Sequence, residues 1–331
     1  MKTIHNEQGR TILSGIKPTG KPHIGNYFGA LKQFVDLQNK HNGGFFMIAD
    51  YHALNFIQNA EEMRTLTKDL LIDFLAIGLD PEKSVIFKQS DVSEHTELAW
   101  IFDTITTLPY LKRAHAYKDA MEKAEGGEEK ISMGTFNYPM LMAADILLYS
   151  PDIVPVGQDQ KQHIEFARDT AEKFNRTFCP EQSEGSIFKL PEAYIMKDVE
   201  TVAGIDGRKM SKSYNNYISL FAEDSEIEEK VMAIVTDSKA EYPENVFYIH
   251  KLFRPAESLD KLYDENKGQY KKLKEILIED LKSFIKPLRE KRREVASDTS
   301  LVKRVLEEGR EKARTVASLK LAEAKRAVGV L

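Results

Sequence analysis

Four short apolar runs in the first half of the chain constrain its fold more than any other feature. They cover residues 11–14, 45–49, 84–87 and 153–156 and are rich in Ile, Leu, Val and Phe. Amphipathic helical patterns lie between them, for example over residues 63–77. Strands that are apolar on both faces and alternate with helices are typical of a parallel sheet covered on both sides. The sequence therefore predicts an α/β fold with a Rossmann-like, doubly wound parallel sheet.

The rest of the chain predicts a smaller, all-helical domain. No strand pattern follows about residue 223, whereas apolar residues recur at helical spacing over 273–288 and again over 301–328. Asp298 stands between these two stripes and is a candidate N-cap. Residues 118–135, by contrast, are polar and carry adjacent glycines, so we expect an exposed and mobile excursion there. The expected organisation is a sheet domain over 1–204, a helical domain over 205–298 and a helical tail over 299–331 that packs back on the sheet domain.

The composition excludes several classes of function. The net charge is −5 at pH 7, so nucleic acid would have to bind a local basic patch on an acidic body. The single cysteine, Cys179, excludes a disulfide framework, a four-cysteine zinc site and an iron–sulfur cluster. No uncharged apolar run approaches about 18 residues, so we expect no membrane span. The polar residues 1–10 do not resemble a secretory signal, and the sequence predicts a cytoplasmic protein.

Two separate segments have the residue types of phosphate-binding sites. The first, which we name the histidine turn, covers residues 18–26 and joins the first predicted strand to a helix. Its polar and small residues are Thr19, Gly20, His23, Gly25 and Asn26. The amides and dipole of a helix N-terminus attract anions, and His23 and Asn26, three residues apart, can both donate to phosphate oxygens. Gly25 lets the backbone approach a nucleotide closely. Taken alone, the segment is equally consistent with a structural turn that carries a surface histidine.

The second segment, the lysine loop, covers residues 207–213. Lys209 and Lys212 stand three residues apart, separated by Met210 and Ser211, in surroundings of Gly, Ser and Asn. Two lysines on such a segment can form a mobile pair of cations for a polyphosphate. A solvated surface loop is the alternative, because lysines usually lie in water. Only the fold can bring the lysine loop and the histidine turn together.

A third segment resembles a phosphate-binding loop and is rejected. Residues 15–21 follow a strand and match the first seven positions of a P-loop. The eighth position has to be Ser or Thr to bind Mg²⁺, and here it is Pro22. The helix also begins too late, so the chain is not expected to be a P-loop NTPase.

In order and spacing, the histidine turn and the lysine loop resemble the two signatures of class I aminoacyl-tRNA synthetases, which activate an amino acid with ATP and load it onto tRNA. Asn26 stands where the class consensus has His, a departure usual in one branch. Further segments resemble the bacterial tryptophanyl-tRNA synthetases. These are residues 14–20, 25–27, 49–53, 138–149, 154–163 and 309–314. The resemblance covers essentially the whole chain.

The resemblance implies roles for individual residues. The implied catalytic residues are His23, Asn26, Lys209 and Lys212. Those implied to bind ATP are Lys17, Thr19, Gly20, Gly25, Gly157, Asp159, Met210 and Ser211. Those implied to bind tryptophan are Leu13, His52, Tyr138, Met142, Asp145, Val154, Val156 and Gln160. Within the last set, Tyr138 and Gln160 correspond to family residues that hold the α-ammonium group of the substrate. His52 corresponds to a pocket-lining position near the substrate's carboxylate. Lys17 stands where many relatives carry Gln, which would put a cation close to the α-phosphate.

Asp145 has independent support from the residues around it. It lies in the otherwise apolar helical pattern of residues 141–149, and a buried carboxylate is costly unless it is paired. An indole N–H is only a donor, so a tryptophan pocket needs an acceptor, and Asp145 supplies one. Met142, one turn earlier, offers a polarizable wall for the ring. Pairing of Asp145 with a neighbouring helix is the alternative.

The resemblance also implies the reaction and its partners. Tryptophan and ATP would give Trp-AMP and then Trp-tRNA(Trp), with Mg²⁺ carried on the ATP phosphates and with no zinc, iron–sulfur cluster or protein-bound metal. The chain would form a homodimer bridged by tRNA, and residues 205–298, which open with the lysine loop, would bind the anticodon. A candidate tRNA-facing basic patch comprises Lys282, Lys286, Arg289, Lys291, Arg292 and Arg293.

Three other functions remain as alternatives. A tyrosyl-tRNA synthetase-like ligase is the nearest, although that family has a Tyr on the first strand where this chain has Leu13. A small-molecule nucleotidylyltransferase shares the histidine motif but is usually much shorter and lacks the helical domain. A regulatory RNA-binding relative would be expected to have lost His23, Lys209 or Lys212, and all three are present.

Overall fold

The protein is built on a parallel sheet in the Rossmann order. The structure is a computed structural model, and it describes residues 10–123, 127–157, 161–179, 186–195, 202–236 and 242–331. The strands are β1 (Leu13–Ile16), β2 (Phe45–Ile48), β3 (Val85–Lys88), β4 (Ile153–Val156) and β5 (Glu192–Ile195). Pairing is parallel throughout, and an Ile12–Ile153 bridge places β4 beside β1. The spatial order is therefore β5-β4-β1-β2-β3, which reverses between β1 and β4, where such sheets bind ligands.

The sheet confirms the predicted fold class, with one strand more than the sequence indicated. The four predicted strands lie within two residues of the observed ones. Sequence analysis missed β5, whose residues Glu-Ala-Tyr-Ile carry a charge and show no apolar run. Glu192 and Tyr194 are exposed and alternate with half-buried Ala193, as on an edge strand, so no continuous hydrophobic pattern marked β5.

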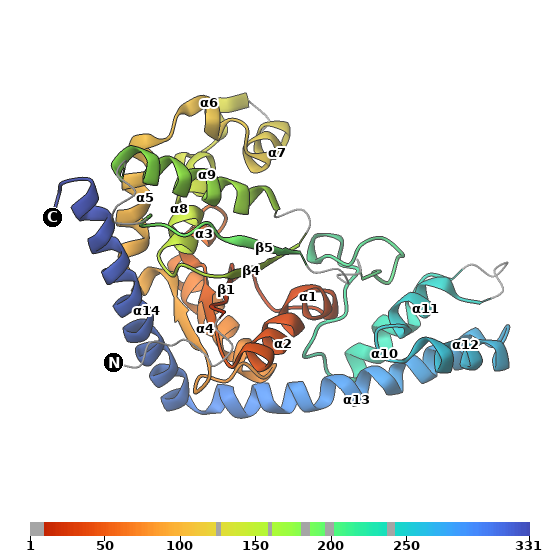
Figure 1. Ribbon diagram of the computed structural model, residues 1–331. Coiled ribbons are helices and arrows are strands. Elements are labelled where there is room, and N and C mark those ends of the chain that lie inside the picture. The colour runs from red at the N-terminus through yellow and green to blue at the C-terminus, as the bar shows by residue number, and fades with distance from the viewer. Residues whose placement is uncertain (1–9, 124–126, 158–160, 180–185, 196–201, 237–241) are drawn as a thin grey trace.

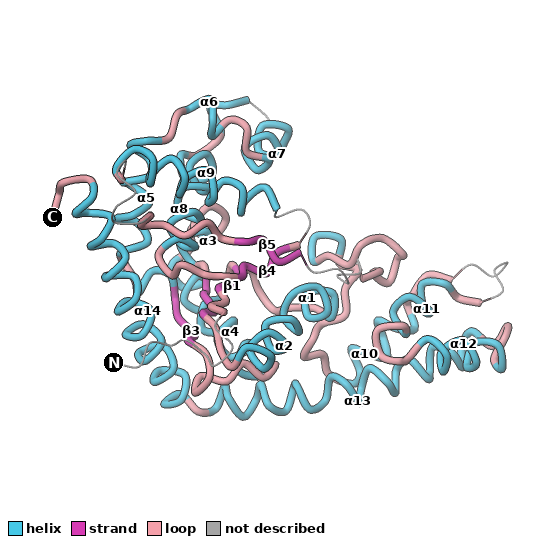
Figure 2. Tube along the Cα trace, in the orientation of Figure 1, coloured by secondary structure: helices cyan, strands magenta, loops and turns pink. Residues whose placement is uncertain are grey.

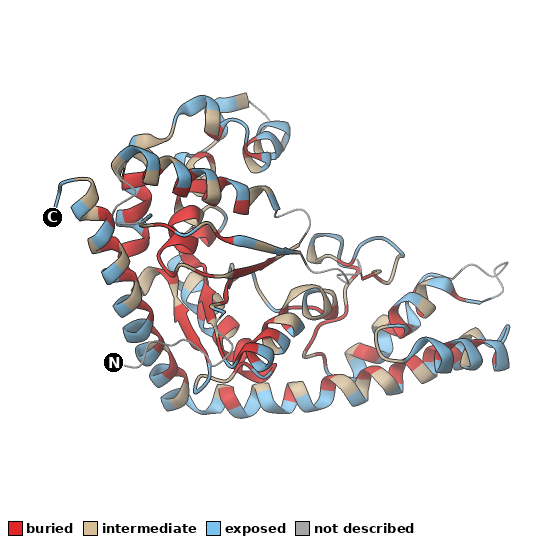
Figure 3. Ribbon diagram, in the orientation of Figure 1, coloured by how far each residue is buried: buried red, intermediate tan, exposed pale blue. Residues whose placement is uncertain are grey.

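Two hydrophobic cores lie on opposite faces of the sheet. Along β2, Phe45 and Met47 join one core while Phe46 and Ile48 join the other, because successive strand side chains point to opposite faces. Figure 3 shows the buried residues concentrated on the strands and on the helix faces turned toward them. The helices around the sheet are α1 (Ile24–Asn26), α2 (Lys32–His41), α3 (Asp50–Ala53), α4 (Ala60–Ala76), α5 (Glu94–Ile105), α6 (Leu108–Leu111), α7 (His115–Lys123), α8 (Met133–Leu147) and α9 (Lys161–Phe178).

The described part of the expected excursion at residues 118–135 is mostly exposed, as predicted, but it is largely helical, and its mobility stays a prediction. Residues His115–Lys123 form α7, a 3₁₀ turn covers Gly127–Lys130, and α8 begins at Met133. Buried Tyr117 anchors α7, because its ring packs edge-on against Phe136 of α8 with 5.3 Å between centroids. Tyr117 lies one residue before the polar stretch, so that stretch alone carried no sign of the anchor.

The C-terminal third is helical, as predicted. Its helices are α10 (Asp224–Met232), α11 (Glu244–His250), α12 (Ala256–Glu265), α13 (Tyr270–Ser297) and α14 (Thr299–Ala327). The long α13 runs from the outlying helices α10–α12 to the sheet domain, where it contacts α4 (Figures 1 and 2). Asp298 caps α14 as predicted, since its Oδ1 accepts from the Leu301 N–H at 2.9 Å.

The tail helix α14 packs against the sheet domain, along β3 and α5 (Figure 1). Gly309 makes this contact possible, because a Cβ atom at that position would overlap the Ile86 carbonyl of β3. Val302 and Val305 of α14 join one core, and Ala313 and its apolar neighbours on α14 join the other. Across the part of the chain that the structure describes, no helix is both long and apolar enough to span a bilayer.

Candidate active site

The histidine turn ends in a double hydrogen bond at the mouth of α1. His23 is the N-cap, and its Nδ1 accepts from the Asn26 N–H at 3.1 Å. In return, the Asn26 Oδ1 accepts from the His23 N–H at 3.1 Å. Because Nδ1 is an acceptor, the proton of the neutral ring lies on Nε2. The side-chain amide of Asn26 likewise keeps its NH₂ group as a donor.

His23 is held in the neutral form. Burial and, second, the charge of Lys212 lower the pKa of His23 to about 4. At pH 7 the ring therefore offers one N–H, on Nε2, instead of a positive charge. Together with the Asn26 amide it presents two neutral donors at the positive end of α1, which suits the oxygens of a phosphate group.

The fold brings the lysine loop against the histidine turn. The Lys212 Nζ donates to the carbonyl oxygens of Thr19, at 3.1 Å, and Gly20, at 2.8 Å. The loop also contacts α1, because a Cβ atom on Gly25 would lie 3.4 Å from the Cβ of Met210. Gly20 itself has φ +95°, a conformation that favours glycine. The two segments proposed from the sequence are thus neighbours in space.

A short backbone ladder fixes this arrangement. The N–H of Ile24 donates to the Ile218 carbonyl and the N–H of Leu220 to the Pro22 carbonyl, both at 3.0 Å. Met210 is buried in the second core, whereas the side chain of Lys209 extends into solvent. Lys212 is half-buried, and burial lowers its pKa, partly offset by the charge of Asp73. The lysine loop therefore has a buried anchor and an exposed cation.

Asn216 is a structural residue of this site that sequence analysis missed. Its side chain is buried and fully bonded: Oδ1 accepts from the Ser211 N–H at 2.7 Å, and Nδ2 donates to the Lys209 carbonyl at 3.1 Å and to Asp206 at 2.7 Å. Gly204 leaves room for this amide, which a Cβ atom would overlap. The available signal was an Asn three residues after the lysine loop, in a mostly polar segment.

Lys17 directly follows β1, on the side of the sheet where ligands bind. Its Nζ lies 4.6 Å from the ring centroid of Phe56, in a cation–π contact. The Phe56 ring is exposed, and desolvation lowers the pKa of Lys17. Neither the pairing nor Phe56 was expected from the sequence, since the two residues belong to separate loops.

Asp145 is buried in α8 and is bonded to three side chains. Its Oδ2 accepts from the Nε2 of His52 at 2.9 Å. Its Oδ1 accepts from the Gln89 amide at 2.8 Å and from the Nδ1 of His95 at 2.6 Å. Burial works to raise the pKa of Asp145, but the hydrogen bonds of His52 and His95 hold it at about 2. Asp145 is therefore an anion. The structure shows the pairing with a neighbouring helix that the sequence left as the alternative, since His95 belongs to α5, and the role of Asp145 as indole acceptor stays a prediction.

Tyr138 lies next to His52, one of the partners of Asp145. Its ring packs edge-on against His52, with 5.8 Å between centroids, and its hydroxyl lies 2.9 Å from the ring nitrogens of His163. Burial and the charge of Asp119 raise the pKa of Tyr138, so its hydroxyl stays protonated. His163 was quoted in the sequence analysis only as part of a motif, and the structure places it as the partner of Tyr138.

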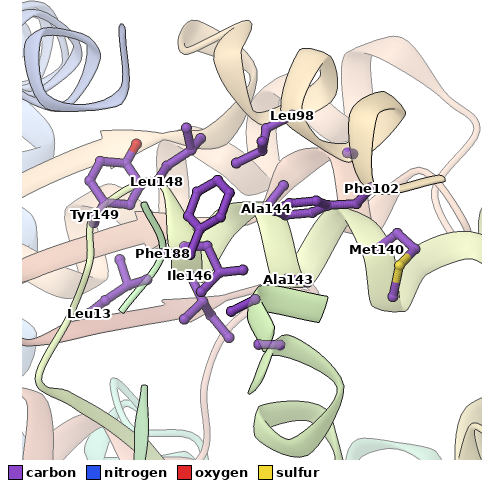
Figure 4. Packing of buried hydrophobic residues seen from close by; sticks show 14 of the residues in the cluster. Leu13, Leu98, Phe102, Met140, Ala143, Ala144, Ile146, Leu148, Tyr149 and Phe188 are labelled. Atoms are coloured by element: carbon purple, nitrogen blue, oxygen red, sulfur yellow. The ribbon is translucent and has the colours of Figure 1, made fainter. Parts of the chain in front are cut away.

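The apolar residues of the expected tryptophan site lie on α8, β4 and β1. Leu13 and Val154 are buried in the first core, and Met142 and Val156 pack against it half-buried. Figure 4 shows Leu13 and Tyr149 at one end of this core and Met140 at the other. Gly157 is half-buried just beyond β4. Asp159 and Gln160 lie outside the described residues, so their expected roles stay predictions.

The expected basic patch on α13 is only partly a free surface. Arg289 is buried and donates to the Ala222 carbonyl and to Asp224, while Arg292 binds Asp69 and Asp73 of α4. The remaining pairs are Lys282 with Glu228 and Glu279, Lys291 with Glu294, and Arg293 with Glu223. Lys286 has no such ion pair within the described residues. Arg289 and Arg292 continue the apolar stripe of α13 and hold this helix to α10 and α4, whereas Lys286, Lys291 and Arg293 are exposed.

These features define the class of protein. A Rossmann sheet carries a histidine-capped helix mouth beyond β1, and a two-lysine loop packs onto it, which is the arrangement of a class I aminoacyl-tRNA synthetase. A family model described as tRNA synthetases class I (W and Y) matches residues 5–297. The chain belongs to this family.

Individual relatives agree over nearly the whole chain. The tryptophan–tRNA ligase of Fusobacterium nucleatum subsp. nucleatum is 47% identical over 328 residues, which covers 96% of this chain and 98% of the relative. That of Rhodopirellula baltica is 43% identical and covers 96% of this chain and 99% of its own. The crystal structure of tryptophanyl-tRNA synthetase from Campylobacter jejuni, complexed with ADP and tryptophan, superposes with a TM-score of 0.86 at 41% identity and covers 96% of this chain and 99% of that one.

Proposed function

We propose that this protein is a tryptophan–tRNA ligase. It converts L-tryptophan and ATP to Trp-AMP and pyrophosphate, and then transfers tryptophan to tRNA(Trp) with release of AMP. The observation that carries the amino-acid assignment is Asp145, an ionised acceptor that is buried in the otherwise apolar helix α8. An indole N–H is only a donor, so it adds a fourth hydrogen bond to the three that this carboxylate accepts from His52, Gln89 and His95.

In the first step the carboxylate of tryptophan attacks the α-phosphorus of ATP, and the bond to the bridging oxygen of pyrophosphate breaks. His23 and Asn26 donate hydrogen bonds to the phosphate oxygens from the mouth of α1. Lys209 and Lys212 meet the negative charge that develops on the departing pyrophosphate. In the second step a ribose hydroxyl of tRNA attacks the carbonyl carbon of Trp-AMP, and AMP leaves. No protein nucleophile is required, because the site works by positioning and by charge stabilisation.

Mg²⁺ enters this scheme as part of the substrate MgATP. Within the described ranges, no group of three or more His, Cys, Asp or Glu side chains is placed to hold a metal ion. A lone Mg²⁺ is usually held by the substrate's phosphates with only one or two protein carboxylates. The chain's own contribution is therefore the donors and cations of the histidine turn and the lysine loop.

Different residues contact the indole N–H, the ring and the α-ammonium group of tryptophan. Asp145 accepts from the indole N–H, and the apolar residues Leu13, Met142, Val154 and Val156 enclose the ring. Tyr138 and Gln160 accept from the α-ammonium group. His52 lies between Asp145 and Tyr138, on the side that faces the substrate backbone, and Lys17 leaves Phe56 to reach the α-phosphate. Thr19, Gly20, Gly25, Gly157, Asp159, Met210 and Ser211 line the nucleotide.

The helical domain over residues 205–298 binds the anticodon part of tRNA(Trp), and the protein acts in the cytoplasm as a homodimer. Trp100 supports a dimer face on the sheet domain, since its side chain is 71% exposed on α5, with exposed Leu108 on the adjoining α6. Trp100 is the single tryptophan of the chain, so its fluorescence reports the surface directly. Dilution of a dimer is expected to shift its emission to the red, and Trp100→Glu to give a monomer in sedimentation. A monomeric wild type at micromolar concentration would remove the dimer.

The test of the function is ATP–pyrophosphate exchange with each amino acid in turn. We expect exchange to require tryptophan, followed by tryptophan-dependent charging of tRNA(Trp). Tyrosine-dependent exchange would instead favour the tyrosyl-type alternative, which the family description leaves open. Leu13, where that alternative has a Tyr, gives no partner for the tyrosine hydroxyl from the first strand, so we expect no exchange with tyrosine.

A further inference from the structure

The carboxylate of Asp145 belongs to a longer chain of hydrogen bonds. Behind it, the Nε2 of His95 lies 2.9 Å from the hydroxyl of Tyr149. His95 and Gln89 have no exposed surface, and Tyr149 and Asp145 are 3% and 2% exposed. Neither His95, Gln89 nor Tyr149 has a part in the scheme above. In a dry interior every polar group needs a hydrogen-bond partner, so the position of each proton determines which groups donate and which accept.

The direction of these bonds follows from Asp145. An ionised carboxylate only accepts, so the Nδ1 of His95 must carry a proton. The hydroxyl of Tyr149 is protonated, because burial raises its pKa well above the usual value. Within the described residues its hydrogen-bond partner is the Nε2 of His95, so the hydroxyl donates to that nitrogen. His95 is then a neutral ring in the Nδ1–H form, with Tyr149 holding its other nitrogen.

The amide of Gln89 is oriented in the same way. Its Oε1 accepts from the backbone N–H of Tyr51 at 3.1 Å, which turns its NH₂ group toward Asp145. Two donors, from Gln89 and His95, thus converge on Oδ1, and one, from His52, on Oδ2. A carboxylate has about four acceptor positions, two on each oxygen. The described residues occupy three of them, and the remaining position is on Oδ2.

We propose that His95, held in its Nδ1–H form by Tyr149, is a positioning residue that fixes the Asp145 carboxylate with one acceptor position on Oδ2 open to the indole N–H. This inference rests on the proposed tryptophan specificity. His95 does not touch the substrate. Together with Gln89 it saturates Oδ1 and prevents rotation of the carboxylate. An amino acid with a correctly placed N–H then fills the fourth acceptor position. An analogue without that N–H leaves the open position unfilled.

The kinetic test uses an isosteric pair of substrates, tryptophan and β-(benzothiophen-3-yl)alanine, in which sulfur replaces the indole N–H. The measured quantity is the ratio of their kcat/KM values in pyrophosphate exchange. In His95→Phe, which keeps a ring but no donor, we expect the KM for tryptophan to rise about tenfold with little change in kcat, and the ratio to fall about tenfold. His95→Asn places an amide near Nδ1 and is expected to restore much of the ratio. If His95 had a purely structural role, its loss would lower kcat/KM equally for both substrates.

The second test reads the proton directly. In ¹⁵N-histidine-labelled wild type, NMR should show His95 with a protonated Nδ1 and an unprotonated Nε2, and Tyr149→Phe should disturb that signal. A spectrum of the Nε2–H form or of a doubly protonated ring overturns the proposal. So does an unchanged substrate ratio in a folded His95→Phe protein, as judged by thermal unfolding. Absence of tryptophan-dependent exchange in wild type would instead overturn the proposed function, and the NMR result would still decide the state of His95.

Discussion

The two halves of the active site are built in opposite ways. On the nucleotide side, Lys209 extends into solvent and Lys212 is held by the carbonyl oxygens of Thr19 and Gly20, which ATP phosphates would have to replace. On the amino-acid side, Asp145 is buried with three partners already in place. With the roles proposed above, the protein would select its amino acid with a rigid, prearranged group. It would bind the reacting phosphates with cations that change partners.

The lysine loop should give the largest effect. Lys209→Ala and Lys212→Ala are each expected to reduce kcat for pyrophosphate exchange by about 10²–10³, because each lysine meets charge that develops on the leaving group. The KM for tryptophan should change little. Lys32→Ala, which breaks a surface pair with Asp36, is the control. Near-normal turnover in both loop variants would contradict the division between the two halves.

Asp145 tests the rigid half. Asp145→Ala is expected to lower kcat/KM for tryptophan about tenfold to hundredfold and to narrow its margin over phenylalanine, which fits the pocket but has no N–H. Asp145→Asn keeps an acceptor and should lose less, if its amide oxygen turns inward. The measurement is the ratio of kcat/KM for tryptophan and phenylalanine in the three proteins. An intact ratio in Asp145→Ala would make the residue structural, with Tyr138 or Gln160 as the next candidate acceptor.

Asn216 tests whether the lysine loop depends on the hydrogen bonds that anchor it. Asn216→Ala removes the bonds to Ser211, Lys209 and Asp206 and should lower kcat about tenfold at an unchanged tryptophan KM, because the lysines lose their orientation. Asn59→Ala is a matched control, since it removes the cap of α4, away from the loop, and costs about 1 kcal/mol of stability. Equal kcat values in the two variants would show that the loop does not need this anchor.

His23 gives the smallest and most specific effect. Its folded pKa of about 4 lies below the ordinary 6.5, so between these values the unfolded chain binds the proton and the folded one does not. Stability should therefore fall as the pH drops from 6.5 to 4. In Lys212→Ala the pKa of His23, followed by NMR, should rise but stay below 6.5, because burial is the larger cause. An unshifted pKa would mean that Lys212 does not act on His23.

The features that could be predicted from the sequence are those with a local pattern. The buried strands, the histidine turn, the lysine loop and the buried Asp145 can each be recognised from a few neighbouring residues. The partners Gln89 and His95 do not, since they meet Asp145 only through the fold. One signal was available for His95, which shares a helical face with Leu98 and Phe102 and so is a polar residue on an apolar stripe, as Asp145 is.

The misplacement of Arg289 and Arg292 in a surface patch has the same origin. Arg289 lies one turn beyond buried Ile285 and continues the stripe that includes Leu281, so its position on the helix indicated burial while its charge suggested a nucleic-acid surface. Charge alone does not separate a binding patch from an internal ion pair, because both need cations. The carboxylates that decide the matter, Asp73 and Asp224, lie far away in the chain.

The close contact between Gly309 and β3 has a consequence for how this protein is made. Within the described sheet β3 is the outermost strand on its side, and α14 lies along it. An uncovered edge strand can pair with a strand of another chain. During synthesis β3 leaves the ribosome long before α14, so the growing chain carries an open edge until the tail helix arrives. A side chain at position 309 would keep the helix from seating and would prolong that exposure, so its harm would appear first as aggregation of newly made chains.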